Sequence, residues 1–209
     1  FHARHPEVRV ELILSNEPLD LIGGEIDVAL RLGNLPDSNL VARRLGTLRT
    51  QVYAATSYLA KHGEPLHPND LQHHRVMAMP KHRHGNNYHW TLNDGSGDQE
   101  FTVNPILVAN DPAALKGALL CGEGVMIAAD VMVKPFVEMG VVQRVLAGWI
   151  GGEYELNAVF PRGHTQSPKV RAFVDFLLEH LDLEIDYMSA HCPLMMAKEA
   201  KHAHEQERE

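Results

Sequence analysis

Histidine, whose side chain can bind a metal or transfer a proton, occurs 14 times among the 209 residues of this sequence. Several stand in close pairs, namely His73 with His74, His82 with His84, and His202 with His204. A protein metal site needs three or four convergent ligands and outer hydrogen bonds that orient them. These pairs lie in polar stretches or in the tail, so the pattern favours solvated surface histidines, and neither a metal nor another cofactor is expected.

The two cysteines, Cys121 and Cys192, are too far apart for a CxxC redox pair and too few for a disulfide framework. Cys121 precedes the motif GEGV without a nearby resolving cysteine, so a small buried thiol is favoured over a redox sensor. GEGV also lacks the GxGxxG and GxxxxGKS spacing of phosphate-binding loops. No catalytic residue is predicted, and an enzyme that uses Cys121 or a histidine pair is kept only as a rival.

Composition predicts a globular protein, because 44% hydrophobic residues can form a substantial core in one large domain or two small ones. The net charge of −8 argues against a surface that follows nucleic-acid phosphates. The sequence has no apolar run near the roughly 18 residues of a membrane-spanning helix, and no signal-peptide pattern. We therefore expect a cytoplasmic protein without membrane contacts.

The first part of the chain predicts a parallel sheet. A strand is expected where apolar and polar residues alternate, with Val8, Val10, Leu12 and Leu14 on one face. A short helix is expected within residues 17–25. Residues 26–33 (IDVALRLG) are apolar on both faces, as in a strand covered by helices. Strand, helix and strand in this order predict parallel pairing.

The middle of the chain begins with a strand at residues 50–55 and a short helix from Ser57, which Gly63 can end in a left-handed conformation. Residues 67–99 are more polar and predict only brief strands, in VMAM, YHWTL and EFTV. This stretch indicates a second structural unit.

Regular α/β order returns after residue 109. Asp111 is typical of a helix cap, with Pro112 in the first turn and Gly122 just past the end. A buried strand at 124–129, a second helix capped by Asp130, and a strand at 141–146 follow. The methionines of this region are expected in the core, namely Met126, Met132 and Met139.

The last predicted elements are a strand at residues 154–163 (YELNAVFPRG) and an amphipathic helix that begins after Ser167. The apolar residues of this helix recur at three- and four-residue spacing from Val170 to Leu181. If the middle unit is an insertion, this strand returns the chain to the first sheet, and the helix packs on it.

Four segments, taken in their order along the chain, resemble the effector-binding domain of LysR-type transcriptional regulators. They are HPEVRVELILSNEPLDLIGGEIDVALRLGNLPDSNLVARRLG, YLAKHGEPLHPNDLQHH, NDPAALKGALLCGEGVMIAADV and FPRGHTQSPKVRAFVDFLLEHL. The resemblance covers residues 1–181 and leaves the tail outside it. In other members a strand and most of a helix precede the segment equivalent to the start of this chain.

The resemblance implies an α/β, periplasmic-binding-protein-like type 2 fold of two Rossmann-like lobes joined by two crossover segments. Lobe I is expected at residues 1–54 and 159–182, lobe II at 55–158, and the tail at 183–209. It also implies a switch without catalytic residues, which binds a small-molecule effector between the lobes and assembles as a homodimer or tetramer. DNA binding would belong to an N-terminal domain outside this chain. A solute-binding protein of a transporter, which shares the fold, is the alternative.

Effector contacts are expected where loops leave the carboxyl ends of strands and helices begin. The predicted contact residues are Ser15, Asn16, Arg31, Leu32, Gly33, Asn34, Thr56, Asn110, Asp111, Gly124, Val125 and Phe160. The helix that begins at Asp111 favours a small organic anion through its dipole, and Arg31 could clamp a carboxylate. Two alternatives stay open: Arg31 could pair with Asp27 or Asp37 instead, and the negative charges of Glu17 and Asp111 would suit an amine-bearing or neutral effector.

Dimer contacts are expected on the helix within residues 17–25 and on the helix that follows Asp111. Leu115, Leu119 and Leu120 exceed what a single buried stripe needs, so part of this helix is predicted to face a partner chain.

Overall fold

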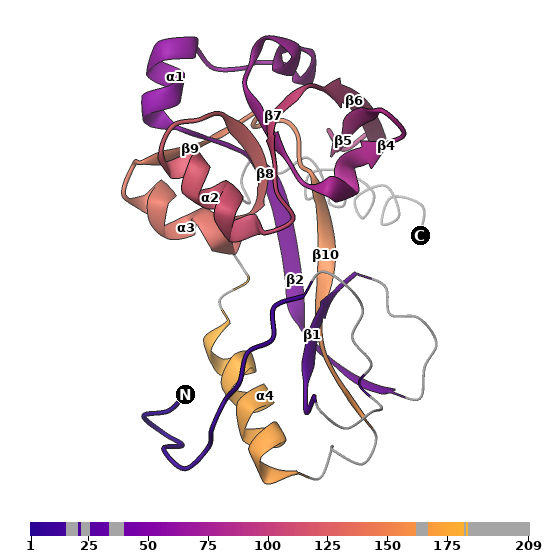
Figure 1. The fold of residues 1–209 in the computed structure, drawn as a ribbon, viewed down its shortest axis with the longest axis vertical. Coiled ribbons are helices and arrows are strands. Elements are labelled where there is room, and N and C mark those ends of the chain that lie inside the picture. The colour runs from indigo at the N-terminus through magenta and orange to yellow at the C-terminus, as the bar shows by residue number, and fades with distance from the viewer. Residues whose placement is uncertain (16–20, 22–25, 34–39, 162–166, 182, 184–209) are drawn as a thin grey trace, which may run out of the picture. The chain divides into compact units, whose positions relative to one another are not determined.

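A computed structural model of the chain describes residues 1–15, 21, 26–33, 40–161, 167–181 and 183. The described chain divides into two units (Figure 1). Unit 1 comprises Phe1–Leu48 and Tyr154–Leu183, and unit 2 comprises residues 49–153. The strands β2 (Leu40–Ala55) and β10 (Gly152–Pro161) each contribute residues to both units. The division falls within these two strands, a few residues before each of the predicted lobe boundaries.

Unit 1 is built on β1 (Ala29–Leu32), which pairs antiparallel with β10, and on α4 (Pro168–His180). The apolar stripe predicted for α4 is confirmed, since Val170 and Val174 are buried in one cluster with Leu45 of β2 and Ala158 of β10. Ser167 precedes the helix as expected, but its side chain makes no capping hydrogen bond. Hydrophobic burial against the sheet, rather than the cap, holds this helix in place.

The strand predicted around Val8 to Leu14 is wrong. This segment is irregular, and Leu12 and Leu14 are 76% and 91% exposed. A strand needs a neighbour for its N–H and C=O groups, and no described strand pairs with this segment. The predicted parallel pairing is therefore also wrong, because β1 has β10 as its described partner and runs antiparallel to it. The helix expected within 17–25 lies outside the described residues except for Leu21.

Unit 2 contains a sheet in which the carboxyl-terminal part of β2 lies between β8 (Val125–Ala129) and β9 (Val142–Val145), antiparallel to both. Next to β8 come β3 (Val76–Ala78) and then β7 (Pro105–Val108), and β3 is parallel to both of its neighbours. The predicted strands at 50–55, 124–129 and 141–146 are confirmed.

Helices cover this sheet. They are α1 (Thr56–His62), α2 (Pro112–Leu120) and α3 (Asp130–Glu138), with short 3-10 turns η1 (Pro68–His73) and η2 (Pro80–His82). Gly63 ends α1 as predicted and has a positive φ of 77°, but its ψ of 172° differs from the left-handed helical conformation that was expected. The polar stretch also forms a separate antiparallel sheet of β4 (Arg83–His84), β5 (Asn87–Asn93) and β6 (Asp98–Val103). The predicted brief strands are confirmed, with VMAM as β3 of the larger sheet and YHWTL and EFTV in this smaller one.

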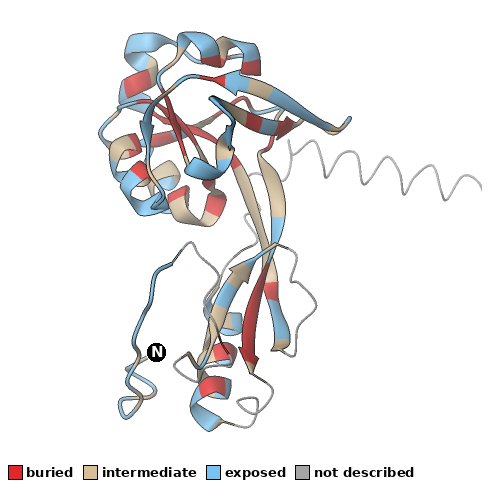
Figure 2. Cartoon of the chain, turned by 45° about the vertical axis from the view of Figure 1, so that its right-hand side comes forward, coloured by how far each residue is buried: buried red, intermediate tan, exposed pale blue. Residues whose placement is uncertain are grey.

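Alternation along the strands divides the buried residues of unit 2 into two clusters. Tyr53 and Met77 lie with Leu115 of α2 and Val133 of α3, whereas Val52 and Val125 lie with Tyr58 and Trp90 on the other face. Figure 2 shows that the strands of unit 2 contain many buried residues, and the two clusters lie on opposite faces of these strands. Such double coverage explains why the strand sequences are almost continuously apolar.

Three expectations about side chains in unit 2 are corrected. The leucines of α2 are accounted for by the core, since Leu115 and Leu119 are buried and Leu120 packs partly against the same cluster, and a dimer contact on this helix stays a prediction. Cys121 is exposed rather than buried, because it is the residue at which α2 ends. Met139, at the end of α3, is 63% exposed and does not belong to the core.

Gly124 allows β8 to approach the segment that precedes β3. A Cβ atom at Gly124 would overlap the backbone carbonyl of Arg75, whose oxygen accepts a hydrogen bond of 2.8 Å from the Val125 N–H. The backbone, unlike a flexible side chain, cannot move aside without breaking this hydrogen bond. Gly124 is therefore required by close backbone packing at the amino end of β8.

We predict that Gly124→Ala lowers the free energy of unfolding by about 1–3 kcal/mol, the usual cost of overpacking. Gly117→Ala in α2 is the matched control, because a Cβ there meets no atom within 4 Å. The control should be neutral or more stable by up to about 1 kcal/mol, since alanine is the better helix former. Urea denaturation measures both, and equal stabilities would contradict the packing argument.

Candidate functional site

The carboxyl ends of β3, β7 and β8 lie at one edge of the unit 2 sheet, because these strands are parallel. We call this edge the carboxyl edge and define it by residues 79–82, residues 109–111 and Asp130, which follow the three strands. The Ala109 N–H donates a hydrogen bond of 3.2 Å to the Ala78 carbonyl, so the first two segments leave the sheet side by side. In open α/β sheets, ligands bind at such an edge.

At the carboxyl edge, Asp111 caps α2 as predicted. Its Oδ1 accepts a hydrogen bond of 2.8 Å from the Ala113 N–H, and Pro112 takes the first helical position. Asn110, directly before the cap, has an exposed side chain. The positive end of the α2 dipole therefore lies at this edge, and the Asp111 carboxylate is already engaged by its own helix.

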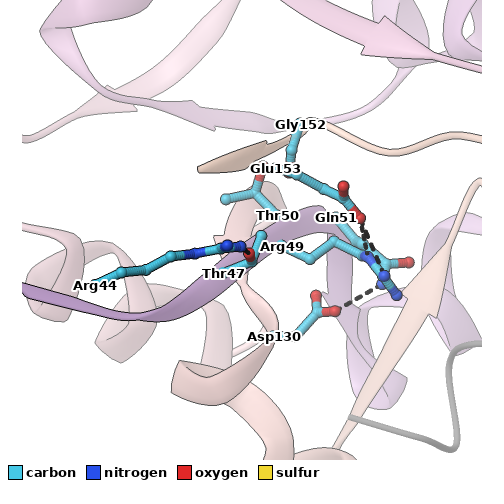
Figure 3. A network of polar contacts seen from close by, with 8 residues as sticks. All are labelled: Arg44, Thr47, Arg49, Thr50, Gln51, Asp130, Gly152 and Glu153. Carbon is cyan, nitrogen blue, oxygen red and sulfur yellow. Dashed lines mark hydrogen bonds and ion pairs between the residues drawn. The ribbon is translucent and has the colours of Figure 1, made fainter. Parts of the chain in front are cut away.

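Asp130 does not cap α3 in the way the sequence suggested. The N-cap position belongs to Ala129, and Asp130 is the first helical residue. Its carboxylate is 3% exposed and accepts hydrogen bonds of 2.8 Å each from the Gln51 Nε2 group and the Tyr53 hydroxyl. Figure 3 shows the contact between Gln51 and Asp130. The acid thus joins α3 to the central strand β2 through side chains rather than through its own backbone.

Burial raises the pKa of the Asp130 carboxyl, and the two hydrogen bonds together with the charges of Arg49 and Arg144 offset only part of this effect. The Oε1 atom of Gln51 is buried and has no hydrogen-bond partner among the residues that the structure describes. This polar cluster therefore carries an electrostatic cost inside the core of unit 2.

A second polar contact in unit 2 joins β2 to the beginning of β10. The Arg49 guanidinium donates through Nε and Nη2 to Oε1 of Glu153, at 3.2 and 3.1 Å, and both side chains are about one-fifth exposed. Thr50 Oγ1 donates to the Gly152 carbonyl at 3.3 Å. Figure 3 shows these contacts on the same strand as Gln51. They fix β2 and β10 to each other within unit 2.

His82 follows β3 at the carboxyl edge and is held as a neutral ring. Its Nδ1 accepts a hydrogen bond of 3.3 Å from the Met79 N–H, and its ring meets Trp90 edge-on. Burial lowers the pKa of His82 to about 4, with contributions from the positive charges of Lys81 and His84. The neighbouring Lys81 ammonium is thus a positive group beside an uncharged histidine at neutral pH.

The structure does not bring Thr56, Gly124 and Val125 together with Asn110 and Asp111. Since β2 and β8 are antiparallel, Ala54 pairs with Val125 and Thr50 pairs with Ala129. Thr56 and Val125 therefore lie at the edge opposite the carboxyl edge. Thr56 Oγ1 is bound there to the carbonyls of Gly140 and Val141, at 3.1 Å each, which gives it a structural role.

The remaining predicted contact residues belong to unit 1. Arg31 and Leu32 lie in β1, and Gly33 follows with a φ of 82° while its N–H donates to the Glu155 carbonyl at 2.9 Å. Phe160 is 7% exposed and packs in the core against α4. Ser15 is exposed. Asn16 and Asn34 lie outside the described residues.

Three residues with a place in the candidate site were missed or misread from the sequence, namely Gln51, Lys81 and Asp130. Lys81 could have been found, since it follows the predicted strand VMAM at its carboxyl end. Gln51 gave no such signal, because a single polar residue in a strand can face either way.

The family described as LysR substrate binding domain matches residues 1–182 of this chain. The chain belongs to this family. An HTH-type transcriptional regulator of Xanthomonas campestris pv. campestris (strain 8004) is 60% identical over 199 residues, which cover 94% of this chain and 58% of that protein. The HTH-type transcriptional regulator CrgA of Neisseria meningitidis serogroup B is 31% identical over 182 residues, covering 87% and 60% of the two chains. This LysR-family chain spans about three-fifths of the length of these relatives.

Solved structures agree with this assignment. CrgA, a LysR-type transcriptional regulator from Neisseria meningitidis, matches with a TM-score of 0.76 and 30% identity, over 87% of this chain and 61% of that one. The Vibrio cholerae virulence activator AphB matches with a TM-score of 0.71 and 28% identity, over 85% and 60%. The periplasmic-binding-protein-like type 2 fold implied by the resemblance is confirmed, and a regulator domain is favoured over a transporter's solute-binding protein.

The described part of this LysR-family domain holds no group of three or more His, Cys, Asp or Glu side chains that could bind a metal ion. None of the helices traced in the described ranges is long and apolar enough to cross a membrane.

We predict that Tyr53→Phe lowers the free energy of unfolding by about 1–2 kcal/mol, because it removes one donor from the buried Asp130 carboxylate. Tyr88→Phe is the matched control, since Tyr88 is half-buried and outside this network. The control should change stability by less than about 0.5 kcal/mol. Denaturant unfolding distinguishes them, and an equal effect of both substitutions would contradict the role assigned to the hydroxyl group.

We predict that the stability of the folded chain depends on pH through His82. Between its unperturbed pKa of 6.5 and its folded pKa of about 4, the unfolded chain binds a proton at this ring that the folded chain does not. The stabilisation that comes from the neutral His82 ring is therefore fully present above pH 6.5 and is lost as the pH falls from 6.5 to about 4. His82→Asn keeps an acceptor for the Met79 N–H and should reduce the loss by up to about 2 kcal/mol after solvent screening.

Thermal or urea unfolding of wild type and variant across this pH range measures the effect. Asp130 acts in the opposite direction, because its raised pKa favours the folded state at acid pH, but its contribution cancels in the comparison. His73→Asn, at an exposed position of η1, is the control and should follow the wild-type curve. Parallel curves for His82→Asn and wild type would overturn the assignment.

Proposed function

We propose that this chain is the effector-sensing and oligomerisation domain of a cytoplasmic LysR-type transcription regulator, and that a small metabolite binds at the carboxyl edge of unit 2. The observation that carries the site is the parallel pairing of β3 with β7 and β8, which gathers residues 79–82, residues 109–111 and Asp130 at one edge. Arg31 and Gly33, at the end of β1 in unit 1, stay effector contacts predicted from the sequence.

The proposed mechanism is a shift in population. A ligand with different affinities for two arrangements of the domain stabilises the arrangement that it binds better, by no more than that difference in free energy. In a homodimer or tetramer, such a shift would alter how DNA-binding domains, located elsewhere in the longer protein, engage a promoter. No turnover of the ligand is required, so we propose that the domain is not an enzyme.

A metabolite screen by thermal shift tests the proposal. A ligand present at about 100 times its dissociation constant stabilises the folded chain by about 2.7 kcal/mol, a readily measured shift. We expect Arg31→Ala or Asn110→Ala to abolish the stabilisation by a hit compound. The matched controls are Arg171→Ala on α4 and Asn104→Ala before β7, which remove the same side chains at exposed positions.

Hits that stabilise wild type, Arg31→Ala and Asn110→Ala equally would reject the proposed contacts. Cys121→Ser should leave ligand binding unchanged. If it instead abolished a measurable conversion of the ligand, the enzyme reading that uses Cys121 would replace the sensor.

A further inference from the structure

Tyr58 joins α1 to the segment that leads into β3. Its side chain is 1% exposed and belongs to the core cluster that also holds Leu71 and Val76. The Tyr58 hydroxyl oxygen accepts a hydrogen bond of 2.9 Å from the Arg75 N–H, and the same hydroxyl group lies 3.1 Å from Nδ1 of His74. These two contacts fix the residues directly before β3 to the helix.

The two contacts also determine where the hydroxyl proton of Tyr58 lies. Its oxygen already accepts from the Arg75 N–H, so its proton is donated to Nδ1 of His74, and the described residues offer it no other acceptor within hydrogen-bond distance. His74 is then a neutral ring that carries its own proton on Nε2. A protonated His74 would present an N–H at this place and leave the buried hydroxyl proton without an acceptor.

Titratable groups face His74 from both of the elements that pack against it. Asp70 and His73 belong to η1, and His62 belongs to α1. Burial lowers the pKa of the His74 ring, the charge of Asp70 raises it, and the charges of His62 and His73 lower it. On balance this environment favours the neutral ring, and acidification adds like charges beside it.

The residues before β3 also carry the packing of β8 on this strand. The Arg75 carbonyl accepts from the Val125 N–H at 2.8 Å, and the Arg75 guanidinium pairs with Glu123 at 3.0 Å. β3 itself is only three residues long, and beyond its other end Nδ1 of His82 accepts from the Met79 N–H. The strand that leads to the carboxyl edge is therefore flanked at both ends by imidazole rings that act as acceptors.

We propose that His74 is an acid-sensitive switch: its protonation breaks the contact with the Tyr58 hydroxyl group and releases Arg75, and with it the start of β3, from α1. The released state gains population at acid pH, because a solvated His74 binds a proton more readily than the ring in the closed contact. The contact is at full strength above the ordinary pKa of 6.5 and weakens as the pH falls below that value. This switch does not depend on the identity of the effector.

Hydrogen exchange of the backbone amides, followed by NMR on the whole 209-residue chain without added ligand, tests the proposal. The readout is the Arg75 N–H, which donates to the Tyr58 hydroxyl group. Between about pH 7.5 and about pH 5.5, an open state with an ordinary histidine pKa gains up to about 10-fold in population over the closed state. The protection of the Arg75 N–H, corrected for its intrinsic exchange rate, should therefore fall by about 3- to 10-fold.

The Met79 N–H is a control within the same chain. It is bonded to Nδ1 of His82, whose pKa of about 4 keeps that ring neutral across the whole range. Its protection should stay constant, whereas global unfolding would expose both amides alike. An equal loss of protection at Arg75 and Met79 would overturn a local switch.

Four variants assign the titrating group. His74→Asn places an acceptor that does not titrate near the position of Nδ1, so the protection of the Arg75 N–H should become equal at the two pH values. Tyr58→Phe keeps the buried ring but removes the acceptor, and this amide should lose its protection at both. His62→Phe keeps an aromatic ring against Tyr58, from which the His62 ring lies 4.4 Å away, and should respond to pH like wild type. His73→Asn, at an exposed position of η1, should also follow wild type.

Urea unfolding confirms that each variant is folded. A pH response that persists in His74→Asn, or that disappears in His62→Phe or His73→Asn, assigns the titration to another group and overturns the proposal. Protection of the wild-type Arg75 N–H that is the same at both pH values does so as well. The proposed effector site is tested separately, because no ligand is present in these measurements.

Discussion

Parallel pairing of β3 with its two neighbours is the constraint on which the candidate site depends. Parallel strands end at the same edge, and each must be followed by a segment that leaves the sheet there. In unit 2 these segments are the η2 turn, the start of α2 and the start of α3. Polar groups from distant parts of the sequence therefore meet at one edge without any need for mutual attraction. The apolar clusters on both faces of the sheet hold the strands in that order.

The polar groups inside unit 2 differ from those at its edge in what they contribute. Asp130, Gln51 and Tyr53 are buried, and their hydrogen bonds offset the desolvation of a carboxylate only in part. Such a cluster adds little net stability but fixes how α3 sits on β2, because any other arrangement would leave more buried groups unpaired. Arg49 and Glu153 similarly fix β10 beside β2 where the chain leaves unit 2. Fixed neighbours of this kind hold the exposed groups of the edge in position.

The carboxyl edge carries charges of both signs, from Lys81, Asp111 and Asp130, in a chain whose net charge is −8. Overall charge governs solubility and long-range attraction, whereas recognition of a small molecule depends on the few groups within contact distance. At this edge Asp130 is buried and accepts a hydrogen bond from Gln51, whereas Asp111 is exposed and accepts one from its own helix, and Lys81 is also exposed.

The sequence by itself determined the elements whose signals are local. The caps and glycines of α1 and α2, the apolar stripe of α4 and the buried runs of β8 and β9 follow from short-range sterics and periodicity, and the order of segments identified the family. Only the tertiary structure decided what depends on a partner: residues near Val8 form no strand because none of the described strands pairs with them, and Asp130 binds β2 instead of capping its helix. Strand direction decides at which edge of the sheet each loop emerges, and no single segment encodes that direction. Thr56 and Val125 therefore lie at the edge opposite Asn110.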